Sequence, residues 1–73
     1  MEYVNGKIKM KTARTEAELT QAEVAEKMRL SKKTIVAWEN GKVIPKPAQF
    51  EMFCRICGFT PDQIFLPSEL TIS

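Results

Sequence analysis

The sequence predicts an all-α protein, a single bundle of five short helices. Three observations lead to this fold class. A chain of 73 residues allows one domain with one thin core. Its apolar residues recur at helical spacing instead of alternating as they do in a half-buried strand. Glycines and prolines separate the helical segments, and residues typical of helix starts open several of them.

The first predicted helix spans about residues 7–17 and follows Asn5 or Gly6. Its inward stripe follows the spacing i, i+3, i+4 and i+7, and consists of Met10, Ala13, Arg14 and Ala17. This phase places one charged side chain, that of Arg14, on the side of the helix that faces the core.

The next two helices are predicted from their ends. Thr20 and Glu23 have the spacing of a capping box. Ser31 is a favourable N-cap for the third helix, which ends at Gly41. Only two residues, the first of them Arg29, separate the two helical segments. This connection has the length expected of a helix-turn-helix.

The fourth predicted helix begins at Pro47, a favoured first position, and ends at Gly58. The segment 60–63 has the cap and proline of a short fifth helix. We expect residues 1–66 to form one helix-turn-helix domain. Residues 67–73 are expected to form a C-terminal tail that is flexible or contributes to a dimer.

The residues that catalysis would need are scarce. The chain has no histidine, which removes the commonest general base and the commonest metal ligand. Cys54 and Cys57 precede Gly58 at a helix C-terminus, where the helix dipole disfavours a thiolate. We expect two buried, reduced thiols, with no metal, cofactor, small-molecule substrate or enzyme activity. A small thiol oxidoreductase is an alternative that rests on these two cysteines alone.

The charge is small in total but uneven along the chain. The net charge is +2, yet the segment from Lys27 to Lys46 contains six basic residues and one acidic residue. Residues 47–73 contain one basic and three acidic residues. A positive patch of this kind favours a polyanionic partner such as nucleic acid. The longest apolar run, residues 35–38, is far too short to cross a membrane, so we expect a cytoplasmic protein.

The segment from Leu19 to Gly41 resembles the helix-turn-helix of phage-repressor and Cro-like proteins, the XRE family. The resemblance rests on a set of residues at matching spacing and continues through residues 50–65, which resemble the family's fourth and fifth helices. The matching residues are Leu19, Thr20, Gln21, Ala25, Leu30, Ser31, Ile35, Trp38, Glu39, Asn40 and Gly41, together with Arg14 and Pro45. The resemblance implies a lambda-repressor-like bundle and a sequence-specific DNA-binding regulator of transcription, typically a repressor.

By this resemblance the third helix enters the major groove of double-stranded DNA. The resemblance implies Lys32, Lys33 and Ala37 as base-contacting residues, and Val36 is added because it lies on the same outer face. The lysines can donate to guanine, and the two apolar side chains can touch thymine methyl groups. The two lysines are nearly as well explained as phosphate contacts, because lysine is a flexible point charge. Implied phosphate contacts are Gln21, Thr34, Asn40 and Lys42. Thr34 can also reach a base edge.

Two further features follow from the resemblance. Arg14 and Glu39, both on inward faces, correspond to a semi-buried ion pair between the first and third helices. The family habit also implies a homodimer whose recognition helices lie about 34 Å apart on DNA. In the sequence itself, only the apolar residues near the C-terminus suggest a dimer contact; these are Phe65, Leu66, Leu70 and Ile72.

Two positions depart from the family pattern. Glu18 stands where glycine or asparagine is usual, and Arg29 stands in the turn where glycine is usual. A positive φ at Arg29 would carry a modest strain, and its charge would lie where it can reach DNA.

A second functional class also fits the bundle: an antitoxin or adaptor that binds a protein instead of DNA. The low net charge is compatible with that alternative.

Overall fold

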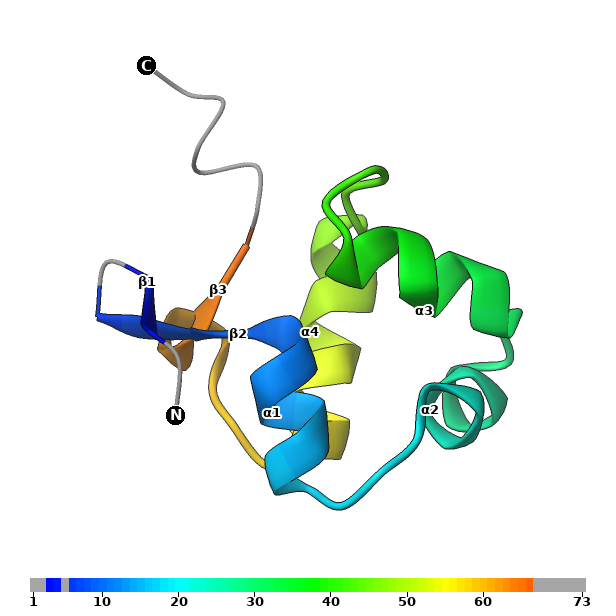
Figure 1. Cartoon of the computed structure of the whole chain (residues 1–73), viewed down its shortest axis with the longest axis horizontal. Coiled ribbons are helices and arrows are strands. Elements are labelled where there is room, and N and C mark those ends of the chain that lie inside the picture. The colour runs from blue at the N-terminus through cyan, green and yellow to red at the C-terminus, as the bar shows by residue number, and fades with distance from the viewer. Residues whose placement is uncertain (1–2, 5, 67–73) are drawn as a thin grey trace.

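The computed structural model describes residues 3–4 and 6–66 (Figure 1). Within these residues, four α-helices and a single 3-10 turn pack beside a small sheet. The α-helices are α1 (Met10–Glu16), α2 (Gln21–Met28), α3 (Lys32–Glu39) and α4 (Pro47–Cys57). The remaining elements are the 3-10 turn η1 (Pro61–Gln63) and the strands β1 (Tyr3–Val4), β2 (Lys7–Lys9) and β3 (Ile64–Phe65).

The predicted start of the first helix is wrong by three residues. Lys7–Lys9 form β2, which pairs antiparallel with β1 and parallel with β3, and α1 begins only at Met10. Ile8 lies opposite Ile64 across the β2–β3 pair, and both side chains are buried. The strand is extended because its backbone pairs with a segment more than fifty residues away.

The prediction of five helices is also wrong. The fifth segment forms a single 3-10 turn, in which Gln63 N donates to Thr60 O at 3.0 Å. The chain then extends as β3, because Ile64 and Phe65 are buried in the sheet instead of continuing a helix. The fold is therefore mostly helical, with a short sheet that joins the two ends of the domain. The predicted boundary at Pro67, the tail of residues 67–73 and the cap at Asn5 lie outside the described residues.

The helix-turn-helix forms as its caps predict. Thr20 Oγ1 accepts from Glu23 N at 3.1 Å, and Glu23 Oε1 accepts from Thr20 N at 2.8 Å. Ser31 Oγ accepts from Thr34 N at 3.3 Å at the start of α3. These side chains satisfy backbone donors that a helix start leaves unpaired. They fix where α2 and α3 begin, and hence the direction of both helices.

All four helices end with the same backbone hydrogen bond, which runs from a nitrogen to the carbonyl five residues earlier. The residue before each donor has a positive φ: Glu18 and Arg29 at 58°, Gly41 at 75° and Gly58 at 83°. This is the Schellman pattern of helix termination. Glycine adopts this conformation without a steric penalty, whereas Glu18 and Arg29 bear a small strain.

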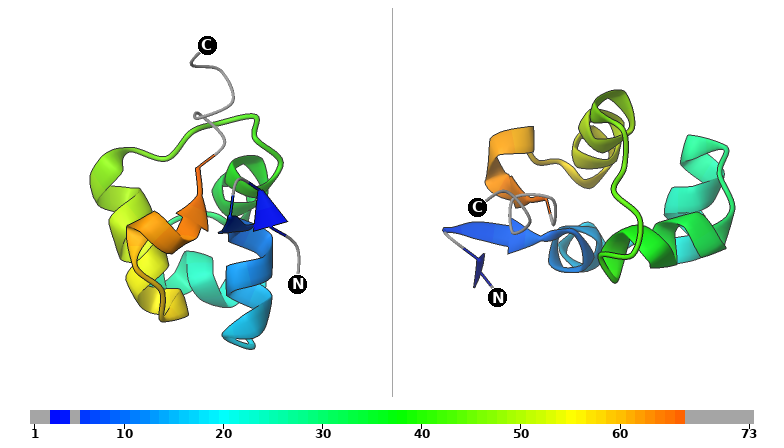
Figure 2. Two further views of the ribbon diagram at one scale, coloured as in Figure 1. Left: turned by 90° about the vertical axis from the view of Figure 1, so that its left-hand side faces the viewer. Right: turned by 90° about the horizontal axis from the view of Figure 1, so that it is seen from above.

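The core lies where α1, α2 and α3 meet α4 and the sheet (Figure 2). Helix α4 packs against α1 and α2, and α3 packs mainly against α2. The largest fully buried side chains are Trp38, Phe53, Ile35, Ile64, Val24 and Cys54. Ala25 of α2 is also buried, and its small side chain would permit the close approach of α3 that the sequence predicts. The result is that α3 is held along its inner side and open along its outer side.

Candidate nucleic-acid interface

The outer face of α3 carries two of the predicted DNA-contacting residues. Lys32 and Lys33 are exposed, whereas Ile35 and Trp38 are buried on the inner side. Successive residues of a helix are turned by about 100°, so the direction of Lys33 lies roughly opposite that of Ile35. The N-terminal end of α3 therefore presents two cationic side chains to solvent.

Val36 and Ala37 complete this outer face and are partly exposed. Ala37 O accepts from Lys42 N at 3.0 Å and from Val43 N at 3.3 Å, and these two bonds cap the C-terminal end of α3. Asn40 and Lys42 are exposed at the C-terminal end of α3. Thr34 is half-buried, and its hydroxyl lies 3.0 Å from that of Ser31.

Arg14 and Glu39 form a bidentate ion pair between α1 and α3. Arg14 Nε donates to Glu39 Oε2 at 2.7 Å, and Arg14 Nη2 donates to Glu39 Oε1 at 3.2 Å. The side chains are 11% and 3% exposed, respectively. Arg14 Nη1 also donates to Leu19 O at 2.8 Å, which ties the connection between α1 and α2 to the same pair. Arg14 thus links three segments of the domain.

The structure also brings Gln21 to this ion pair, a contact that the sequence did not reveal. Gln21 Nε2 donates to Glu39 Oε1 at 3.1 Å. Gln21 is the first residue of α2, and Glu39 is the last residue of α3. The only signal in the sequence was that both residues belong to the same family pattern, which gave no indication that they touch.

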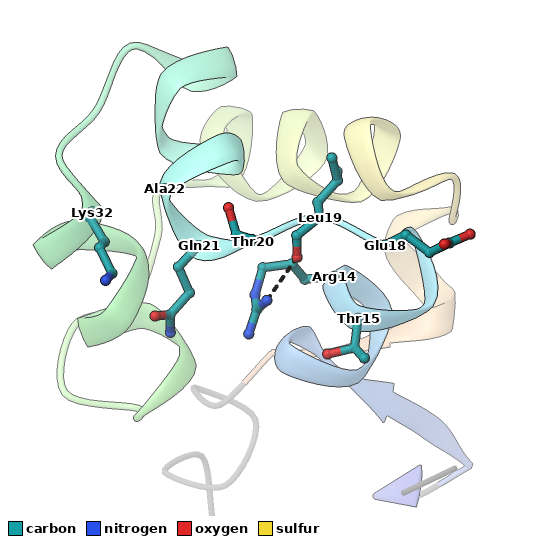
Figure 3. Close-up of a pocket in the computed structure, with 8 residues that line it drawn as sticks. All are labelled: Arg14, Thr15, Glu18, Leu19, Thr20, Gln21, Ala22 and Lys32. Atoms are coloured by element: carbon teal, nitrogen blue, oxygen red, sulfur yellow. Dashed lines mark hydrogen bonds between the residues drawn. The ribbon is translucent and has the colours of Figure 1, made fainter.

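A hollow of about 390 Å³ opens beside these groups, between the end of α1 and the starts of α2 and α3 (Figure 3). Arg14, Gln21 and Lys32 are among the residues that line it, and their side chains extend toward the same side in Figure 3. Lys32 and Gln21 come from different helices and meet here because the turn holds α3 against α2. The wall of the hollow therefore combines an exposed ammonium group with amide and guanidinium donors.

The cysteines do not form part of this surface. Cys54 and Cys57 are buried in α4, on the side that faces the core. Burial raises the pKa of Cys54 to about 12 and the pKa of Cys57 to about 11, which disfavours the thiolates that redox chemistry needs. The described residues contain no group of three or more metal-ligating side chains. Among the same residues, no helix is long and apolar enough to span a membrane.

Comparison with known protein families gives a match over most of the chain. A family model described as a helix-turn-helix domain matches residues 8–64, a range that contains all four α-helices and the turn between α2 and α3. Searches among curated proteins and among solved structures gave no significant match. The family match agrees with the resemblance to phage-repressor and Cro-like proteins. The chain belongs to the helix-turn-helix domain family.

Proposed function

We propose that this protein is a sequence-specific DNA-binding regulator of transcription, a repressor that places α3 in the major groove. The observation that carries this proposal is the exposure of Lys32 and Lys33 at the start of α3, with Lys33 roughly opposite the buried Ile35. In a helix-turn-helix, this end of the second helix contacts base edges. The proposed role requires no catalysis, and DNA as the partner places the protein in the cytoplasm.

Each proposed contact follows from the chemistry of the side chain. Lys32 and Lys33 donate to the O6 and N7 acceptors of guanine, while Val36 and Ala37 touch thymine methyl groups. Phosphate contacts fix the orientation of the domain without reading the sequence. The proposed phosphate contacts are Gln21 at the start of α2, Thr34 in the first turn of α3, and Asn40 and Lys42 after the end of α3.

We also propose that the protein binds DNA as a homodimer. In the described part of the apolar C-terminal segment, Phe65 is 5% exposed and Leu66 is partly buried against the core, so little of its apolar surface is open to a partner. Leu70 and Ile72 lie outside the described residues. The dimer proposal therefore rests on the dimeric DNA binding that is usual in the family. It predicts that the bound DNA contains two half-sites whose centres are about 34 Å apart.

Selection of duplexes from a random pool tests both proposals. The bound fraction is recovered at one fixed salt concentration, sequenced and remeasured over a series of salt concentrations. The proposal predicts a recovered consensus of two inverted half-sites about one DNA turn apart, and affinity that falls steeply with salt. Recovery of random sequence would refute sequence-specific binding, and a single unpaired half-site would refute the dimer.

A second candidate function is an antitoxin or adaptor that binds a partner protein through the same bundle. The observation that favours it is exposed apolar surface: the exposed fractions of Val43, Ile44 and Met52 are 50%, 46% and 50%. Residues of this kind are typical of protein contacts when they form a patch. Pull-down of a stoichiometric protein partner, together with no salt-sensitive DNA binding, would establish this function instead.

A further inference from the structure

The hydrogen bond from Gln21 to Glu39 assigns a role to an acidic residue beside the proposed DNA-binding surface. A primary amide has two N–H donors and one acceptor oxygen, and its two ends exchange when the group rotates by half a turn. Glu39 is an ionised carboxylate that only accepts hydrogen bonds, so it selects the nitrogen of Gln21. The carboxylate thereby fixes which end of the amide faces α3.

The ion pair with Arg14 keeps Glu39 in this position. Both carboxylate oxygens accept from the guanidinium, at 2.7 and 3.2 Å, and the Glu39 side chain is only 3% exposed. Its charge is therefore compensated within the protein, which limits its repulsion of a nearby phosphate. Glu39 Oε1 accepts from both Arg14 Nη2 and Gln21 Nε2, as an oxygen with two lone pairs can.

We propose that Glu39 is a positioning residue for DNA binding, which orients the Gln21 amide so that its remaining N–H is available to a DNA phosphate. This inference rests on the proposed function. It makes a prediction different from that of net charge alone, because removal of Arg14 and Glu39 together leaves the net charge unchanged and is otherwise expected to leave affinity nearly unchanged. Arg14 contributes by holding Glu39 and need not contact DNA itself.

The test uses a variant that removes the ion pair without changing the net charge. Arg14→Met combined with Glu39→Leu replaces the pair by apolar side chains of similar size, and Gln21 loses its partner. The matched control is Arg55→Met with Glu51→Leu, which removes the exposed pair on α4, joined at 3.1 Å, and also leaves the net charge unchanged. Both proteins and the wild type are titrated onto the duplex recovered by selection, at one fixed salt concentration.

The positioning role predicts that the Arg14/Glu39 variant binds about fivefold more weakly, the equivalent of one net hydrogen bond, while the control binds as the wild type does. In a Gln21→Ala background, the same double substitution should cause no further loss. Unchanged or tighter binding by the Arg14/Glu39 variant would overturn the inference. An equal loss in the Gln21→Ala background would also overturn it, since the pair would then act on DNA without Gln21.

A measurement on the wild-type protein keeps the inference testable if the variant does not fold. The side-chain amides of Gln21, Gln49 and Gln63 are compared by NMR, since the latter two use their oxygens to accept from Lys46 N and Thr60 N. The Gln21 amide protons should exchange more slowly with solvent and should shift when the selected duplex is added. Exchange as fast as in Gln49 and Gln63 would contradict the positioning role. Absence of DNA binding by the wild type would instead refute the proposed function.

Discussion

The ion pair between Arg14 and Glu39 gives a stability prediction whose magnitude follows from its burial. The perturbations are Glu39→Leu, Arg14→Met and the two combined. Glu39→Leu leaves the Arg14 guanidinium, 11% exposed, with Leu19 O as its one remaining partner. Arg14→Met leaves a carboxylate that is 3% exposed, with one hydrogen bond from Gln21. Each single substitution therefore leaves an unpaired charge at a position that is largely excluded from solvent.

Removal of one partner of a buried pair costs about 3–5 kcal/mol, whereas replacement of both by apolar side chains is close to neutral. A domain of this size has a free energy of unfolding of about 4–11 kcal/mol. Each single variant should therefore lose a large share of its stability, while the double variant should stay within about 1 kcal/mol of the wild type. Two single losses of about 3 kcal/mol or more, set against a change of about 1 kcal/mol or less in the double variant, imply a coupling between the two positions of at least about 5 kcal/mol.

Urea unfolding provides the assay. Trp38 is the only tryptophan in the chain and is 1% exposed, so its fluorescence reports the loss of the core. Circular dichroism of the helices supplies a second probe, and coincident transitions validate a two-state analysis. Additive losses, with the double variant less stable than either single variant, would refute the reasoning that the two charges compensate each other.

Three further predictions concern the helix ends and the thiols. Arg29→Gly, and separately Glu18→Gly, should raise the free energy of unfolding by about 0.5–1 kcal/mol, because glycine removes the left-handed strain; a lower urea midpoint in either variant would contradict this. Stability should fall as pH rises from about 9 toward 12, because the unfolded thiols ionise first while burial raises the pKa values of Cys54 and Cys57 in the fold. Substitution of both cysteines by alanine should make the free energy of unfolding fall less steeply with pH. The same pH dependence in this variant would show that other groups cause the loss of stability. Thiol reagents should also modify the native cysteines much more slowly than the urea-unfolded ones, and equal rates would show that the thiols are accessible.

The sequence predicted the helix-turn-helix because its signals are local. The capping box of Thr20 and Glu23, the N-cap Ser31 and the stop at Gly41 act over three to five residues. Such short-range hydrogen bonds depend little on the rest of the chain, so the residues alone indicate where α2 and α3 begin and where α3 ends.

The sheet could not be predicted because its pairing is not local. Lys7–Lys9 and Ile64–Phe65 are strands of three and two residues, too short to show an alternating pattern. Each is extended because the other supplies its hydrogen-bond partners, and their register places Ile8 against Ile64. The spacing of the apolar residues therefore predicted that residues 7–9 belong to the first helix, and this prediction is wrong because they pair as a strand in the folded chain.

At the candidate site, the sequence indicated which side chains lie on the inner and outer faces of the helices, but it did not reveal every contact between the helices. The inward phase of Arg14 and Glu39 indicated that the two charges approach each other, because an isolated inward charge is costly. The hydrogen bond from Gln21 to Glu39 depends on how α2 packs against α3, which the residues of neither helix reveal on their own. Residue spacing can identify a helix face, whereas contacts between three helices require the assembled fold.

The most direct test of the account compares affinity for the selected duplex with affinity for a scrambled duplex of the same composition. The measurement is made on the wild type, on Lys32→Ala with Lys33→Ala, and on Lys42→Ala, at one salt concentration. The account predicts that the paired substitution in α3 lowers the ratio of the two affinities at least tenfold, the equivalent of one base contact. Lys42→Ala should weaken both affinities about equally. A ratio that is unchanged without Lys32 and Lys33 would contradict the claim that α3 reads DNA sequence.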